Sequence, residues 1–138
     1  MEKNINKAAF ALVGYQFTKV ALDLSELRPD ANFDISIKPK GHYVHTSGSY
    51  YLCFLFTARV EKKKVVTVEC NAEFRFNQPV APSDIPDYFY SNSIAILFPY
   101  VRAFVSTVTL QANIRPIVIP TLNLSGLSAD LKNNTVNE

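Results

Sequence analysis

The chain has no tryptophan, and only four glycines, two cysteines and two histidines occur in its 138 residues. The glycines form no loop with the spacing that cradles a phosphate, and no Gly-x-Ser-x-Gly motif is present. Charged residues make up 19% of the chain, and the formal net charge of +2 is too small to predict nucleic-acid binding. The sequence therefore gives no sign of a phosphate loop, a serine nucleophile or a nucleic-acid surface.

The histidines do not form a recognisable catalytic or metal site. His42 and His45 lie close together in the chain, but no nearby Cys, Asp or Glu completes a ligand set or an acid–base pair at a familiar spacing. We therefore expect a protein that is not an enzyme and that needs no metal and no cofactor.

The N-terminal residues predict neither a signal peptide nor a membrane anchor, because they include an acidic residue and lack a sustained apolar stretch. We expect a cytoplasmic protein. The length of 138 residues predicts one domain, in which residues 1–8 and 133–138 are frayed tails.

Alternating apolar and polar residues, the pattern of half-buried strands, predict four strands. Within the first strand the alternation changes phase near Thr18 and Lys19, which predicts a bulge or a bend. The predicted strands cover residues 10–24, 33–38, 50–61 and 65–76, with a loop over residues 39–49.

The third and fourth strands are expected to form a hairpin. A turn over residues 62–64 would bring Val60 near Val66 and bury one face of the sheet. The same pairing sends Cys53 and Cys70 to opposite faces, where their Cβ vectors diverge. Both cysteines are therefore predicted to be free thiols.

Residues 94–105 are the most apolar part of the chain, but Pro99 and Arg102 interrupt them. They are too short to cross a bilayer, which takes about 20 apolar residues. Because proline fits best in the first turn of a helix, we predict a helix that starts near Leu97 or Phe98. Its apolar residues form two stripes at helical spacing: Phe98, Val101, Val105, Val108 and Ala112, and then Tyr100 and Phe104.

After this helix, Pro116 and Pro120 predict an extended segment, and residues 125–132 predict a short helix. The fold class is α+β, a four-stranded antiparallel sheet with one principal and one short C-terminal helix on one face. The principal helix is apolar on two sides, and so short a chain has little material to cover both. We expect the surplus to form a ligand groove or to join copies into a homo-oligomer, either a dimer or a tetramer built as a dimer of dimers.

The segment LFPYVRAFVSTVT, followed by PTLNL at residues 120–124, resembles the bacterial protein-export chaperone SecB. In that family an LFPYAR-type helix start precedes a P-x-LNL connection. The order of the elements before it also agrees, so the resemblance covers residues 10–131. It implies a SecB-like fold, with helices packed between the sheets of neighbouring subunits and aromatic-lined grooves that hold unfolded chains.

The resemblance implies an ATP-independent holdase that keeps unfolded precursor proteins competent for export through SecA and the Sec translocase. SecB proteins are typically acidic and present carboxylates to SecA, whereas Asp23 is the only acid at the end of the first strand and is the possible SecA contact. Two alternatives stay open: a SecB-like chaperone for a dedicated client such as an antitoxin, and a small α+β domain that binds an apolar ligand. The candidate positions for the client groove or the subunit interface are Phe98, Tyr100, Phe104, Leu122 and Leu124.

Overall fold

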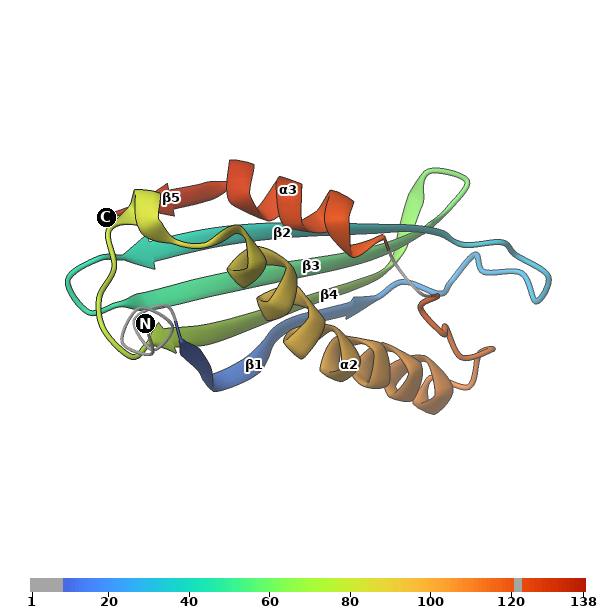
Figure 1. Ribbon diagram of the computed structural model, residues 1–138. Helices are drawn as coiled ribbons and strands as arrows, with labels where there is room; N and C mark the ends of the chain where they lie inside the picture. The colour runs from blue at the N-terminus through green and yellow to red at the C-terminus, as the bar shows by residue number, and fades with distance from the viewer. Residues whose placement is uncertain (1–8, 121–122) are drawn as a thin grey trace.

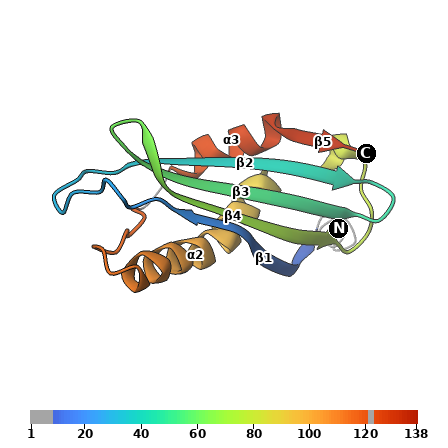
Figure 2. The same cartoon turned by 180° about the vertical axis from the view of Figure 1, so that it is seen from behind.

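A computed structural model of the chain describes residues 9–120 and 123–138, which are built around one mixed sheet. The strand order is β1-β4-β3-β2-β5, and both α-helices lie on the same face of the sheet (Figure 1), so they are behind the strands in the opposite view (Figure 2). The α+β class and the single helical face are therefore confirmed. The elements are β1 (Phe10–Leu22), β2 (Asp34–Val44), β3 (Ser49–Val60), β4 (Lys63–Phe76), the 3-10 helix η1 (Pro82–Asp84), α2 (Asp87–Gln111), α3 (Leu124–Asn133) and β5 (Thr135–Asn137).

The sheet contains a fifth strand, so the prediction of four antiparallel strands is wrong in this detail. Residues 133–138, which were expected to fray, include β5, and β5 pairs in parallel with β2. The hydroxyl oxygens of Tyr50 and Thr135 lie 2.6 Å apart and fix the start of β5 on the core. A strand of three residues is too short for alternation to reveal it in the sequence.

β2 is longer than predicted, because much of the expected loop over residues 39–49 is strand and only residues 45–48 form the turn to β3. Pro39 lies inside β2 without breaking it. Gly41 donates its backbone N–H to the Asn134 carbonyl, away from β3. The nitrogen of Pro39, two residues earlier, points to the same side, so its missing N–H removes no hydrogen bond to β3.

The β3–β4 hairpin has the predicted faces but a tighter register. Glu61 and Lys62 form the turn with φ values of 50° and 71°, the left-handed conformation of a two-residue hairpin turn. The turn pairs Val60 with Lys63, and a register shift between Ala58 and Arg59 then pairs Val66 with Ala58, and not with Val60 as the longer predicted turn requires. Because Ala58 and Val60 are an even number of residues apart, the residues predicted for the core still face the core.

β1 contains two bulges where it pairs with β4. The register shift between Phe17 and Lys19 confirms the predicted change of phase, and a second shift lies between Leu12 and Gly14. Because of the bulge between Phe17 and Lys19, Phe17 and Val20 both pair with residues of β4 that face the helices, although Phe17 is at an odd position and Val20 at an even one.

α2 begins at Asp87, about three turns before the predicted start at Leu97 or Phe98, so that prediction is wrong. Pro99 lies inside the helix, where its missing N–H leaves the Ala95 carbonyl without its usual partner. Both Ala95 and Pro99 are exposed, so water can bond to that carbonyl. The helix therefore continues through the proline.

The core lies between α2 and the helix-side residues of β3 and β4. Leu97, Val101 and Val105 follow one another at one-turn spacing and are fully buried. By length and composition alone, α2 is apolar enough to cross a membrane, which a helix starting near Leu97 would not be. Only 33% of the most apolar stretch of α2 is buried, so this chain leaves much of the helix uncovered.

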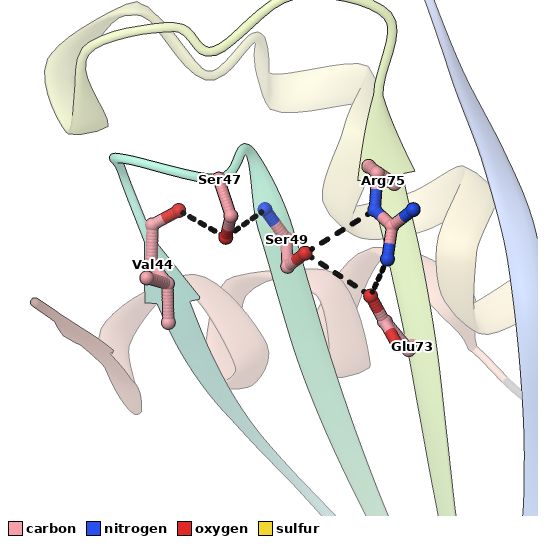
Figure 3. Close-up of polar contacts among 5 residues, drawn as sticks. All are labelled: Val44, Ser47, Ser49, Glu73 and Arg75. Atoms are coloured by element: carbon pink, nitrogen blue, oxygen red, sulfur yellow. Dashed lines mark hydrogen bonds and ion pairs between the residues drawn. The ribbon is translucent and has the colours of Figure 1, made fainter.

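The other face of the sheet carries polar side chains. Ser49 Oγ lies 3.0 Å from Glu73 Oε2, and Arg75 donates to the same carboxylate at 2.7 Å (Figure 3). At the β2–β3 turn, Ser47 Oγ accepts the N–H of Ser49 at 3.3 Å. This cluster ties the β2–β3 turn to β4 on the face of the sheet away from the helices.

Candidate functional site

Two stacked aromatic pairs join α2 to the edge strand β1. The ring centroids of Tyr15 and Tyr100 are 4.5 Å apart, and those of Phe17 and Phe104 are 3.9 Å apart with an interplanar angle of 9°. Tyr100 and Phe104 are one helical turn apart, so both rings lie on the side of α2 that leans over β1. The second apolar stripe predicted for this helix therefore packs on the strand.

Much of this region is uncovered, and we call it the β1 surface. Its members Tyr15, Val20, Leu22, Ile96 and Tyr100 are each between 38% and 43% exposed. β1 is also at the end of the sheet, so its outer backbone edge has no strand partner within residues 9–120 and 123–138. Exposed apolar side chains beside an open strand edge are features of an association surface.

Residues 115–120, here called the strap, cross from α2 towards α3 without regular structure. Ile117 and Ile119 are buried under the helical layer. Ile117 donates its N–H to Thr109 Oγ1 and its carbonyl accepts from Ser106 Oγ, both at 2.9 Å. Two side chains of α2 thus supply the hydrogen bonds that a neighbouring strand would otherwise supply.

A cavity of about 320 Å³, here called the loop cavity, opens where the strap begins. It lies between the β1–β2 loop and the end of α2, and each side contributes one arginine to its lining. Arg28 pairs with Glu61 at 2.8 Å, whereas Arg115 makes no hydrogen bond or ion pair with any residue that the structure describes. The cavity lining includes Leu27, Arg28, Phe33, Asn113, Ile114 and Arg115.

A second cavity, of about 290 Å³, lies between β2 and α3, and we call it the α3 cavity. Ile35 and Ile37 of β2 and Leu127 of α3 line it and are half-buried. Asn123, also in the lining, caps α3 by accepting the N–H of Ser125 at 3.2 Å. The α3 cavity is therefore an apolar hollow with a polar rim beside the end of the strap.

The structure divides the predicted client-binding residues between two regions. Phe98, Tyr100 and Phe104 lie on α2, and the last two stack on β1 at one edge of the sheet. Leu124 is the first residue of α3, which packs against β2 near the other edge, and Leu122 lies outside the described residues. The roles of these residues stay predictions.

The sequence alone gives no sign of the β1 partners of Tyr100 and Phe104, nor of the two arginines of the loop cavity. Tyr15 and Phe17 are both at odd positions of a strand with alternating residues, so alternation places them on the same face of the sheet. Nothing in the sequence pairs them with the helix. Arg28 and Arg115 come from separate loops, and no motif connects them.

Asp23, the predicted SecA contact, follows β1 and is already engaged. Its carboxylate accepts the Ser25 hydroxyl at 2.8 Å and lies 3.6 Å from Lys63 Nζ. The hydrogen bonds from Ser25 and the charge of Lys63 lower the pKa of Asp23 below its ordinary value of 3.8. Asp23 therefore carries a negative charge that Lys63 partly balances.

The histidines and cysteines lie on β2, β3, β4 and one turn. His42 is on β2 rather than in a loop, and its Nε2 lies 3.7 Å from Glu138 Oε1, beyond hydrogen-bond length. Among the described residues, no three His, Cys, Asp or Glu side chains gather as a metal site would require. Cys53 and Cys70 are free and their neighbours in the register put them on opposite faces, as predicted.

No family model matches the chain. Over 41 residues the chain is 54% identical to the uncharacterized protein MJ0357 of Methanocaldococcus jannaschii. That match covers 30% of this chain and 26% of the other, so the chain spans about a quarter of the length of the curated relative it matches.

The fold is found in a solved structure. It is Rv1957 of Mycobacterium tuberculosis, a SecB-like chaperone in complex with a ChAD peptide from the Rv1956 HigA1 antitoxin. The TM-score is 0.64 at 16% sequence identity, over 84% of this chain and 92% of that chain. A protein of unknown function from Streptococcus agalactiae gives a TM-score of 0.46 at 12% identity, over 82% and 98% of the two chains. The chain thus has a SecB-like fold.

Proposed function

We propose that this protein is an ATP-independent holdase of the cytoplasm that binds non-native protein chains through apolar surfaces on its helical side. The observation that carries the proposal is the apolar surface that the chain leaves uncovered there, on α2, β1 and the two cavities beside the strap. The SecB-like fold supports it, because a solved structure with this fold, Rv1957, is a SecB-like chaperone in complex with a peptide.

The mechanism would be burial of apolar client segments without any catalytic step. Each Å² of apolar surface removed from water contributes about 25 cal/mol, so several short segments bound at separate hollows add up to useful affinity. Binding of this kind demands no single client sequence, and a folded client, whose apolar side chains are already buried, offers nothing to bind.

Two classes of client fit the proposal. Export precursors would require docking to SecA, and Asp23, the candidate contact, is hydrogen-bonded to Ser25 and close to Lys63. The chain as a whole carries a net charge of +2. These charges do not make an acidic docking surface for SecA, so they favour a dedicated protein client over export precursors. Rv1957, which has the same fold, is in complex with a peptide from an antitoxin.

The test is suppression of aggregation. A chemically unfolded apolar protein, diluted into buffer without nucleotide, should stay soluble when this protein is present in equimolar amount. Calorimetry should show a negative heat-capacity change for binding the unfolded client, and no binding to the same client once it has folded. Aggregation at the same rate with and without the protein would contradict the proposal.

A small apolar-ligand-binding domain is the second candidate, and the loop cavity is the observation that favours it. Its volume of about 320 Å³ is at the lower end of the range, about 300 to 1,000 Å³, that small-molecule pockets occupy. Such a domain would bind a small ligand but would not slow the aggregation of unrelated proteins, so the same assay separates the two functions.

A further inference from the structure

The loop cavity combines an apolar floor with a positively charged rim. Leu27, Phe33 and Ile114 are half-buried and line it with apolar atoms. Arg28 and Arg115 are exposed and come from its two sides. The volume of about 320 Å³ gives room for one or two large apolar side chains, and two exposed arginines in the lining can meet the polar part of a bound segment.

The two charged residues in the lining of this cavity are both arginines, and the nearest carboxylate that pairs with either of them is that of Glu61, outside the lining. Arg115 has no partner among the described residues, so all its N–H donors are open to a ligand. Arg28 gives one nitrogen to Glu61, at 2.8 Å, and keeps further donors. The neighbouring Asn113, held in a left-handed conformation with φ 64°, adds a side-chain amide to the same rim.

We infer that the loop cavity selects client segments in which an aspartate or glutamate adjoins a large apolar residue. This inference rests on the proposed holdase function and adds a specificity to it. The apolar side chain fills the floor while the carboxylate meets Arg115 and the open donors of Arg28. A client chain is favoured over a free carboxylate, because an ion pair at an exposed rim is weak by itself and a chain gains further contacts along the strap.

The test uses three synthetic peptides with the same central Leu-Phe pair, flanked by Asp-Asp, Asn-Asn or Lys-Lys. Binding is followed by fluorescence anisotropy at low and at high salt. The Asp peptide should bind about five-fold more tightly than the Asn peptide, and the Lys peptide more weakly than either. The difference should largely vanish at about 1 M salt, where the Debye length is about 3 Å.

Arg115→Ala should reduce the preference for the Asp peptide, because Arg28 alone remains, and Arg115→Glu, which places a carboxylate beside Arg28, should remove it. The matched control is Arg102→Glu, which makes the same change of charge at an exposed position of α2 outside the cavity lining and should leave the order unchanged. Circular dichroism melts identify any variant that fails to fold, and the salt dependence of the wild type tests the inference without a variant.

The outcomes separate this inference from the proposed function. Equal binding of the three peptides by a protein that still suppresses aggregation overturns the carboxylate preference alone. Failure to bind any peptide together with failure to suppress aggregation overturns the holdase function. Decanoate that binds at the loop cavity as tightly as the Asp peptide overturns the assignment to client segments and makes the cavity a small-molecule site.

Discussion

The absence of a side chain at Gly41 leaves the space in which β5 joins the sheet. A Cβ atom at this position would overlap the Tyr50 hydroxyl and lie 2.8 Å from Thr135 Oγ1, the two groups that bond to each other at the start of β5. Gly41→Ala should therefore lower the free energy of unfolding by about 1–3 kcal/mol, the usual cost of overpacking a filled site.

Urea unfolding checks this prediction, with Gly14→Ala as the matched control. A Cβ at Gly14 would meet no heavy atom within 4 Å, and its backbone is not left-handed, so this change should be neutral or slightly stabilising. Equal losses for the two variants would show that the Tyr50–Thr135 contact does not limit the space at Gly41.

Cys70 should make the stability of the fold decline in alkaline solution. Burial, and to a lesser degree the neighbouring Cys53, raises the pKa of the Cys70 thiol from 9.0 to about 11. Above its ordinary pKa the unfolded chain loses this proton while the folded chain keeps it. The contribution of Cys70 is therefore complete below pH 9.0 and is lost as the pH rises towards about 11.

Urea unfolding of the wild type and Cys70→Ala measures this effect. Between about pH 8.5 and about pH 10 the wild type should lose about 1 kcal/mol more than the variant, because only the wild type has this thiol to titrate. The other buried titratable groups are common to both proteins and cancel in the comparison. Parallel pH profiles for the two proteins would contradict the raised pKa of Cys70.

At the scale of elements, the strap depends on one hydroxyl of α2. Thr109 Oγ1 accepts the buried N–H of Ile117 at 2.9 Å and donates to the Val105 carbonyl at 2.8 Å. Thr109→Val keeps the shape of the side chain but leaves that N–H unpaired, which costs about 1–3 kcal/mol. The Ile117 amide should then exchange its hydrogen faster than in the wild type.

Thr107→Val is the control for this change, because Thr107 is exposed on the same helix. It should leave both the free energy of unfolding and the exchange at Ile117 near their wild-type values. If Thr109→Val behaves like Thr107→Val, the strap is held by the burial of Ile117 and Ile119 and not by this hydrogen bond.

The existence of β1, β2, β3 and β4 was predictable from alternation, whereas β5 was not and two prolines misled the prediction. Pro39 and Pro99 each indicated a break, yet one lies inside β2 and the other inside α2. In both cases the missing N–H removes no important backbone hydrogen bond. At Pro39 it would point to the outer edge of β2, and at Pro99 it lies on the exposed side of α2. Which side of an element faces solvent depends on the tertiary fold, so the sequence alone could not settle it.

The candidate site was predictable only as a surplus of apolar residues. Helical spacing identified Tyr100 and Phe104 as a stripe, but their stacking on Tyr15 and Phe17 depends on the crossing of α2 over β1. The arginine rim of the loop cavity brings together two loops that share no motif. Contacts of this kind between distant segments leave no periodic signal in one sequence.

For the whole molecule, the uncovered apolar surface outside the loop cavity lies in two places with different features. The β1 surface combines exposed side chains with an open strand edge, which another sheet could extend. The α3 cavity is a hollow beside an edge strand that α3 and β5 already cover in part. An open edge fits a second copy of the chain, and a hollow fits the side chains of a client.

We therefore predict a homo-oligomer whose assembly depends on the β1 surface and whose client binding depends on the two cavities, the α3 cavity among them. Light scattering should give a mass of at least twice 15.5 kDa for the wild type. Tyr100→Ser, which removes the stack on Tyr15 at the open edge, should weaken assembly more than client binding, and Leu127→Ser should do the reverse. Because both changes replace a large apolar or aromatic side chain with serine, each serves as the control for the other. A monomeric wild type would remove the prediction of assembly, and loss of client binding in a fully assembled Tyr100→Ser variant would place Tyr100 in the client groove instead of the interface.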